Sequence, residues 1–339
     1  MRVQLERLWY GDSAAAALLE PLARLYGGVT AGRRGLYRRG WLRARPLGQP
    51  VVVVGNLTVG GTGKTPLAVW VAQQLTAERL RVGIVSRGYG RRSGGARSVH
   101  ADSDWRDVGD EAVLLARRTG CPTMVAADRV AAARTLIARG AQVILADDGL
   151  QHLRLPRDCA IVVIDGARGF GNGRLLPAGP LREPLTTLGG ADAVVINGEP
   201  AHHSIAAPVR AAALRMSLVA QSAVRLDGHG AAVPLEAFRG RRVHAVAGIG
   251  NPQRFFAELA AHGIELRTHA FPDHHPFTAR ELEFGDELPV LMTEKDAVKC
   301  TPFASPGLWC VPVSAHFSEG DARELRARLL GKLRTGAGG

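Results

Sequence analysis

Residues 51–66 read Val-Val-Val-Val-Gly-Asn-Leu-Thr-Val-Gly-Gly-Thr-Gly-Lys-Thr-Pro. An apolar β-branched run is followed by glycines, then by Gly-Lys-Thr, and an apolar helical pattern begins directly afterwards. A buried strand, a tight loop and a helix in this order are typical of a phosphate-binding loop, whose backbone N–H groups point at phosphate oxygens. The stretch therefore predicts that Lys64 reaches the β- and γ-phosphates of a nucleotide and that Thr65 offers its hydroxyl to Mg²⁺.

One position departs from the usual P-loop pattern. The first glycine of G-x-x-x-x-G-K-[ST] would fall where this chain has Thr58. The alternative is an ordinary glycine-rich turn, but the flanking strand and helix favour the P-loop. All but four of the 43 basic residues are arginine, so a lysine kept at position 64 favours a site that needs a compact ammonium.

The composition is that of a globular protein with excess positive charge. At 339 residues and 46% hydrophobic content, the chain is long enough for two domains. The net charge of +12 favours an anionic partner such as nucleic acid, a phosphorylated substrate or an acidic membrane. The four scattered cysteines form no C-x-x-C pair, which indicates a reducing, cytosolic compartment without disulfides or zinc. We expect no signal peptide or membrane span, because no apolar run approaches about 20 residues.

The N-terminal segment combines apolar periodicity with basic charge. Residues 3–26 place apolar side chains mostly three or four apart, which predicts one amphipathic helix or two short ones. An arginine cluster with interleaved aromatic side chains follows, up to residue 45. We predict that residues 1–45 form an amphipathic basic segment at a membrane interface. The alternative is a helix packed on the protein body with a solvated basic face.

Strand and helix patterns alternate after the P-loop. Strands are expected at 82–86, 122–126, 143–146, 160–165 and 193–197, and Asp128 is expected to cap a helix that runs through residue 138. Strands that are apolar throughout imply a parallel sheet covered by helices, so we predict an α/β, P-loop NTPase-like core domain at residues 46–200. Ligands then bind beyond the carboxyl ends of the strands. Asp147 and Asp148 end one strand there, and the long loop 166–190 lies nearby.

A change to Pro, His, Ser and Ala at residues 199–208 marks a boundary. Beyond it, residues 243–250 start a second α/β unit, with strands expected at 265–271 and 308–313 and helices opening at residues 252 and 278. We predict a smaller α/β domain at residues 201–339 and leave open that its closing helix packs back on the core.

With these motifs in place, the chain resembles one family, tetraacyldisaccharide 4′-kinase, the lipid A 4′-kinase of Gram-negative bacteria. The family carries Ser or Thr at the place of Thr58, so this departure supports the resemblance. The motifs extend over nearly the whole chain: residues 55–66, 86–90 (Ser-Arg-Gly-Tyr-Gly), 108–111 (Val-Gly-Asp-Glu), 147–152 (Asp-Asp-Gly-Leu-Gln-His), 177–183 (Pro-Ala-Gly-Pro-Leu-Arg-Glu), 271–275 (Phe-Pro-Asp-His-His) and 293–299 (Thr-Glu-Lys-Asp-Ala-Val-Lys).

The resemblance implies transfer of the γ-phosphate of ATP to the 4′-hydroxyl of a tetraacylated glucosamine disaccharide 1-phosphate. The product would be the lipid IVA-type 1,4′-bisphosphate, made by a peripheral enzyme at the cytoplasmic face of the inner membrane. ATP and Mg²⁺ are the implied cofactors and the lipid is the implied partner. We expect neither a nucleic-acid nor a protein partner.

The resemblance also implies roles for individual residues. Asp110 would be the general base, positioned by His274 from the second domain, while Lys64 acts on the phosphates. The residues implied for the nucleotide are Thr58, Val59, Gly60, Gly61, Thr62, Gly63, Lys64, Thr65, Arg129, Gln151, His152 and Arg182. Those implied for the metal are Thr65, Glu111, Asp147, Asp148 and Glu183.

Each assignment has an alternative from the residues alone. Asp110 has the position of a simple helix cap, and His274 and His275 have that of loop histidines. Lys295 and Lys299 are notable as rare lysines, but no role follows for them.

Two other functional classes compete with the kinase. A regulatory P-loop ATPase often has a lysine where this chain has Val59, and a guanine-nucleotide switch has a spacer that is missing between Lys295 and Asp296. A nucleic-acid-binding protein would fit the charge, but no readable motif supports it.

Overall fold

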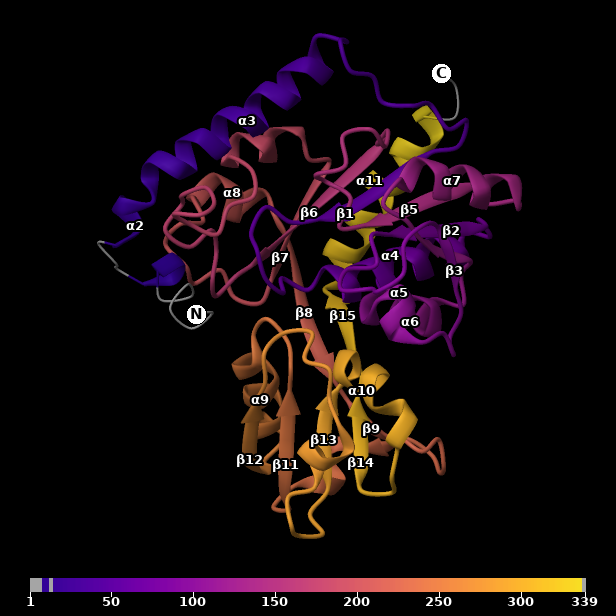
Figure 1. Cartoon of the computed structure of the whole chain (residues 1–339), viewed down its shortest axis with the longest axis vertical. Helices are drawn as coiled ribbons and strands as arrows, with labels where there is room; N and C mark the ends of the chain where they lie inside the picture. Colours follow the sequence, from indigo (N-terminus) through magenta and orange to yellow (C-terminus); the bar gives the residue numbers. More distant parts are fainter. Residues whose placement is uncertain (1–7, 12–14, 337–339) are drawn as a thin grey trace.

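The computed structural model describes residues 8–11 and 15–336, which are built around two β-sheets (Figure 1). Within these residues, nine strands form the first sheet in the order β15-β8-β7-β6-β1-β5-β2-β4-β3. Their bounds are β1 (Val51–Gly55), β2 (Val82–Ser86), β3 (Arg97–Val99), β4 (Thr123–Val125), β5 (Val143–Asp147), β6 (Cys159–Asp165), β7 (Ala193–Asn197), β8 (Leu214–Ala220) and β15 (Val313–Phe317). The inner pairs are parallel and the outermost pair at each edge is antiparallel, which confirms the predicted α/β, P-loop NTPase-like sheet.

The valines of β1 show how helices cover both faces of this sheet. Successive side chains of a strand point to opposite faces. Val52 and Val54 accordingly lie in a core shared with α4 (Lys64–Ala77) and α11 (Glu319–Gly336). Val51 and Val53 lie in a second core shared with α7 (Arg129–Ala138), whose first N–H groups Asp128 caps as predicted. The remaining helices along this part of the chain are α5 (Trp105–Val108), α6 (Asp110–Thr119) and α8 (Ala207–Ala212).

The second sheet has six strands within the described residues, in the order β10-β9-β14-β13-β11-β12. Their bounds are β9 (Ser222–Arg225), β10 (Val233–Pro234), β11 (Arg242–Ala247), β12 (Glu265–Ala270), β13 (Val290–Thr293) and β14 (Leu308–Val311). The four strands from β14 to β12 run parallel, and α9 (Pro252–Ala261) and α10 (Glu294–Cys300) follow β11 and β13 along the chain. The helix expected from residue 278 is only the short 3₁₀ turn Ala279–Leu282.

The chain crosses between the two sheets twice, at adjacent places. The single strand predicted at 308–313 is wrong: β14 belongs to the second sheet and β15 to the first. Pro312 separates them, and proline lacks the N–H that a ladder needs. Gln221 separates β8 from β9 in the same way, and Ala220 pairs with Val313 across the antiparallel β8–β15 pair. Figure 1 shows β8 and β15 side by side, each extending toward the second sheet.

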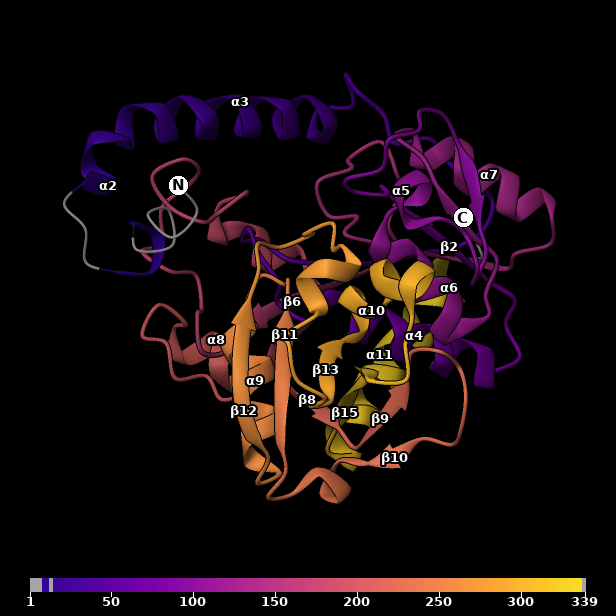
Figure 2. The same ribbon diagram turned by 60° about the horizontal axis from the view of Figure 1, so that its bottom comes forward.

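The N-terminal helices lie at the edge of the molecule (Figures 1 and 2). They are α2 (Ala15–Leu18) and α3 (Glu20–Arg38), so the helix extends 12 residues beyond the predicted end at 26. Residues 1–7 and 12–14 of the predicted segment lie outside the described residues. In the part of the chain that is described, no helix is both long and apolar enough to cross a membrane.

Candidate active site

A cavity of about 800 Å³ lies where the carboxyl ends of strands from both sheets face each other. From the first sheet it is lined by residues 59–66 after β1, by Asp148 after β5 and by Asn197 at the end of β7. From the second it is lined by residues 249–251 after β11, 273–274 after β12 and 293–295 after β13. Because polar groups gather at the carboxyl ends of parallel strands, this junction is where such a fold binds ligands.

The P-loop has the backbone that the sequence predicts. Gly63 precedes α4 with φ 94°, and a Cβ there would meet the Asn197 side-chain nitrogen at 2.4 Å, so only glycine fits. Thr58, by contrast, pairs with Leu181 in an isolated antiparallel bridge, and the N–H of Val59 donates to the Pro180 carbonyl at 2.9 Å. This extended pairing explains why position 58 needs no glycine.

Two cationic side chains, Arg182 and Lys64, lie against the carboxylate of Asp148 beside the P-loop. Arg182 binds its carboxylate through both terminal nitrogens, at 2.9 and 3.0 Å, and Lys64 Nζ lies 3.7 Å from Asp148 Oδ1. Burial opposes ionisation, but Lys64 and Arg182 together lower the pKa of Asp148 well below its usual range. Lys64 Nζ also donates to Asn56 Oδ1 at 3.1 Å, which places its ammonium beside the loop that would carry phosphate.

Asp147 differs from its neighbour, because neither of its carboxylate oxygens has a hydrogen-bond partner among the described residues. Its side chain is 1% exposed, and burial, followed by the charge of Glu111, raises its pKa to about 7. A buried carboxylate without partners needs an explanation, and a cation is one. Mg²⁺ takes one or two carboxylates together with phosphate and water. Asp147, with Thr65 at the start of α4, therefore fits the implied metal.

No group of three or more His, Cys, Asp or Glu side chains among residues 8–11 and 15–336 could hold a metal ion by itself. This is compatible with Mg²⁺ that arrives with a nucleotide, because such sites complete the coordination with phosphate oxygens and water.

Asp110 and His274 are in hydrogen-bond contact, although Asp110 opens a helix beside the first sheet and His274 lies in a loop after β12 of the second. Asp110 opens α6, is 2% exposed and accepts the N–H of Glu111 at 2.8 Å. His274 Nδ1 lies 2.9 Å from Asp110 Oδ2 and 3.1 Å from Oδ1. Burial raises the pKa of Asp110, but the His274 hydrogen bond and the charge of Lys295 lower it below its usual value. Asp110 is thus an ionised carboxylate in the first turn of α6, where Gly109 is the N-cap residue, and it holds the imidazole.

His275 has a different environment from its neighbour. Its Nε2 lies 2.9 Å from Glu281 Oε1, inside the loop that leads to the 3₁₀ turn. The loop alternative therefore describes His275, whereas His274 faces Asp110 and lines the cavity.

Three other residues implied for the nucleotide lie just behind the cavity. Arg129 is buried and donates to the Asp148 carbonyl at 2.7 Å, and Gln151 donates to the Asn56 carbonyl at 3.2 Å. Burial and the charge of Arg129 lower the pKa of His152 to about 4, so this imidazole is neutral. These residues shape the backbone on which Asp148 and Asn56 sit.

Glu183, also implied for the metal, has a different partner in the structure. Its carboxylate is buried and forms an ion pair with Arg34 of α3. Glu111 remains at the cavity, where its Oε1 accepts from Lys295 Nζ at 2.9 Å.

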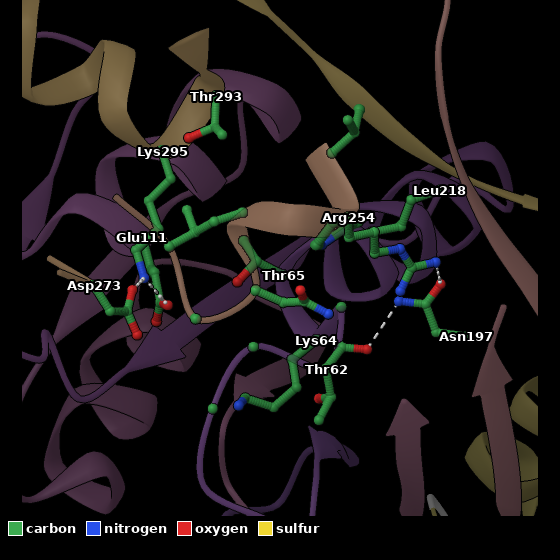
Figure 3. Close-up of a pocket in the computed structure, with 18 of the residues that line it drawn as sticks. Thr62, Lys64, Thr65, Glu111, Asn197, Leu218, Arg254, Asp273, Thr293 and Lys295 are labelled. Atoms are coloured by element: carbon green, nitrogen blue, oxygen red, sulfur yellow. Dashed lines mark hydrogen bonds and ion pairs between the residues drawn. The ribbon is translucent and has the colours of Figure 1, made fainter. Parts of the chain in front are cut away.

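A series of polar contacts that no sequence pattern predicted links α9 to the P-loop. Arg254 Nη2 donates to Asn197 Oδ1 at 2.6 Å, and Asn197 Nδ2 donates to the Thr62 carbonyl at 3.0 Å (Figure 3). Arg254 Nη1 also lies 3.9 Å from the buried Asp165. Asn197 was recognisable as a polar residue that ends a buried strand. Arg254 had no such signal, because its role depends on how the two sheets pack.

A P-loop, an acidic pair beside it and a carboxylate–imidazole pair across the cavity define a P-loop phosphotransferase that uses ATP and Mg²⁺. Residues 15–334 match the family model described as tetraacyldisaccharide-1-P 4′-kinase. The chain belongs to this family.

Relatives and a solved structure agree with this assignment. The chain is 52% identical to the tetraacyldisaccharide 4′-kinase of Alkalilimnicola ehrlichii over 321 residues, which cover 93% of this chain and 92% of the relative. It is 49% identical to that of Xanthomonas campestris pv. campestris over 320 residues, covering 91% and 90%. The crystal structure of LpxK from Aquifex aeolicus in complex with ATP is similar with a TM-score of 0.75 and 29% identity, covering 94% of this chain and 99% of that one.

Proposed function

We propose that this protein transfers the γ-phosphate of ATP to the 4′-hydroxyl of a tetraacylated glucosamine disaccharide 1-phosphate. The observation that carries the proposal is the ionised Asp110, which the second sheet holds through His274 at the edge of a cavity that also contains the P-loop. A sugar hydroxyl that attacks phosphorus must lose its proton, and a carboxylate in hydrogen-bond reach can accept it.

The remaining residues have roles that follow from their positions. Lys64 and the N-terminal N–H groups of α4 bind the phosphates, and Asn56 keeps the lysine beside the loop. Thr65 and Asp147 would hold Mg²⁺, which when bound offsets the negative charge that spreads over the transferred group. Asp148 is neutralised by Lys64 and Arg182 and orients them.

We further propose that α3 rests on the cytoplasmic face of the inner membrane, where the lipid substrate resides. Leu18, at the end of α2, and Leu22, Leu25 and Val29 of α3 form one stripe at helical spacing, and their exposed fractions range from 54% to 81%. A surface helix normally buries its apolar stripe. An exposed apolar stripe on a basic segment supports an interfacial helix.

The other side of α3 explains why the stripe faces outward. Tyr26 donates its hydroxyl to the Arg182 carbonyl at 2.9 Å, Arg34 binds Glu183 and Thr187, and Arg33 donates to the Gln151 carbonyl at 3.0 Å. The polar side is therefore fixed to the loops that carry the site. Contact of α3 with a bilayer would bring the cavity to a defined distance from the lipid surface.

The test is to incubate purified protein with Mg²⁺, γ-labelled ATP and tetraacyldisaccharide 1-phosphate in mixed micelles and to separate the lipids. We expect a labelled lipid that is absent with Lys64→Ala, because no other ammonium serves the P-loop. ATP hydrolysis without labelled lipid would identify a switch ATPase instead. No turnover by folded protein would refute the kinase proposal.

The membrane proposal is tested separately by sedimentation with anionic phospholipid vesicles. Serine at the four stripe positions is expected to release the protein from the vesicles, whereas Leu185→Ser, at an exposed leucine away from the stripe, is expected to leave binding unchanged. Equal binding by both variants would contradict the interfacial role of α3.

A further inference from the structure

Lys295 is one of the chain's four lysines, and it lies in the cavity on the side opposite the P-loop. It is the second residue of α10, directly after β13 of the second sheet. Its ammonium points at acceptors from both sheets (Figure 3). Nζ lies 2.9 Å from Glu111 Oε1, 3.2 Å from Asp273 Oδ1 and 3.2 Å from His274 Nε2.

The charge state of Lys295 fixes the direction of these three hydrogen bonds. A lysine amine is protonated at neutral pH, and Nζ lies within hydrogen-bond distance of the carboxylates of Glu111 and Asp273, which stabilise the ammonium. An ammonium has three N–H donors and no acceptor. The three neighbours therefore accept, and His274 Nε2 must do so with its lone pair.

A neutral imidazole carries one proton, so an accepting Nε2 places that proton on Nδ1. Nδ1 is the nitrogen that faces Asp110, at 2.9 and 3.1 Å from its two oxygens. Both ends of the ring are then satisfied, one as donor and one as acceptor. The lone pair of His274 is occupied by Lys295, so the proton acceptor of this pair is the Asp110 carboxylate, through a lone pair that its hydrogen bonds leave available.

The backbone of His274 has a left-handed conformation, which contacts from neighbouring residues hold in place. This residue has φ 61°, in the left-handed region that is strained for a non-glycine residue. Its N–H donates to the Gly248 carbonyl at 3.2 Å, and Tyr89 packs against its ring with centroids 4.8 Å apart. Lys295, bound to Asp273 of this loop and to Glu111 of α6, adds a second connection beside the Asp110–His274 hydrogen bond.

We propose that Lys295 is a positioning residue that fixes the tautomer of His274 and thereby makes Asp110 the acceptor of the substrate proton. The hydroxyl O–H bond breaks and its proton moves to an Asp110 oxygen. The hydroxyl oxygen forms the new bond to the γ-phosphorus, and the bond from that phosphorus to the bridging oxygen breaks to release ADP. The identity of the hydroxyl rests on the proposed function, whereas the tautomer does not.

Lys299, one turn further along α10, has a different role. Its side chain is 0% exposed, with Nζ 2.7 Å from Asp296 Oδ1 and 5.1 Å from the centre of the Phe277 ring. Its Nζ lies 3.9 Å from Asp110 Oδ2, and within the described part of the chain it forms no hydrogen bond or ion pair with His274. Lys299 forms a buried ion pair with Asp296 of the same helix, so replacing Lys299 would not test how the tautomer of His274 is controlled.

The direct test uses the wild-type chain labelled with ¹⁵N-histidine. Two-bond ¹H–¹⁵N spectra identify which ring nitrogen carries the proton, and His274→Gln assigns the resonance. We expect the Nδ1–H tautomer at neutral pH. An Nε2–H tautomer or a doubly protonated ring would overturn the proposal. This readout needs no kinase activity, so it separates failure of this inference from failure of the proposed function.

A kinetic test uses a double-mutant cycle. Lys295→Met is expected to lower kcat at least tenfold with little change in the KM for ATP, and to cost less than twofold in a His274→Ala background. Lys295→Arg keeps the donors and is expected to recover most of the rate. Lys332→Met removes a lysine–aspartate pair of 2.7 Å outside the cavity and is the matched control. Equal losses in both backgrounds, or an unchanged rate for Lys295→Met, would refute the role, and the spectrum decides if Lys295→Met does not fold.

Discussion

Replacing Gly250 with alanine tests whether the second sheet presses directly on the P-loop. Gly250 follows β11, and a Cβ at this position would lie 2.6 Å from the amide nitrogen of Gly61 and 3.5 Å from the carbonyl carbon of Gly60. Both are backbone atoms, which cannot rotate away as a side chain would. Gly250 has no positive φ, so alanine fits its own backbone and any effect reports the contact alone.

The expected magnitude follows from the overlap. Ordinary Cβ contacts begin near 3.4 Å, so the two loops must separate by about 0.8 Å. Overpacking of this kind costs about 1–3 kcal/mol. At about 2–4 °C per kcal/mol, the Tm should fall by roughly 2–12 °C. We also expect a higher KM for ATP, because the displaced loop is the one that carries the phosphates.

The assay combines thermal unfolding with steady-state kinetics at varied ATP. Gly307→Ala is the matched control, because a Cβ there meets nothing within 4 Å and its φ is not positive. A wild-type Tm and a wild-type KM for Gly250→Ala would refute direct contact between the sheets at the P-loop. An equal loss in Gly307→Ala would assign the effect to glycine replacement in general.

Three further predictions concern the same site. Asp110→Asn should lower kcat by about 10²–10⁴ with ATP affinity retained in nucleotide titrations, whereas a mere helix cap would lose stability and keep its rate. Arg254→Ala leaves Asn197 and the buried Asp165 without their cation, so the free energy of unfolding in urea should fall by about 1–3 kcal/mol and ATP should bind more weakly, while Arg254→Lys loses less. The folded structure lowers the pKa of Asp110, so its ionised carboxylate stabilises the fold fully above the unfolded pKa of about 3.9, and this stabilisation is lost as the pH falls through the folded pKa. The free energies of unfolding in urea of wild type and Asp110→Asn should therefore differ by a constant amount above about pH 5 and converge in more acidic solution.

The sequence predicted the parts of the fold that local patterns encode. The valines of β1, the glycines after them and Lys64 specify strand, loop and helix within 16 residues, and Asp128 caps α7 as its position implies. The sequence also predicts acidic residues at a strand end, and the structure has Asp147 as the last residue of β5 and Asp148 beside Lys64. The rule works because parallel strands end at the same edge of a sheet.

Contacts made between distant segments left no comparable signal. Glu183 pairs with Arg34 only because α3 docks on the loop that contains it, and that docking depends on side chains 149 residues apart. The length of α3 itself was missed because its glycines, such as Gly28 and Gly32, each disfavour a helix by about 1 kcal/mol. Bonds to the protein body offset this cost, and no local propensity reports them.

The adjacent crossings at Gln221 and Pro312 mean that residues 222–311 are, topologically, an insertion into a finished α/β unit. Ala220 and Val313 already face each other across the β8–β15 pair, so a two-residue turn could join them and close the first sheet without the second. Such a shortened chain would keep the P-loop, Asp110 and Asp147. It would lose His274, Lys295 and Arg254 together. The first unit would therefore retain the proton acceptor and the phosphate-binding loop, whereas the inserted residues supply the side chains that position them.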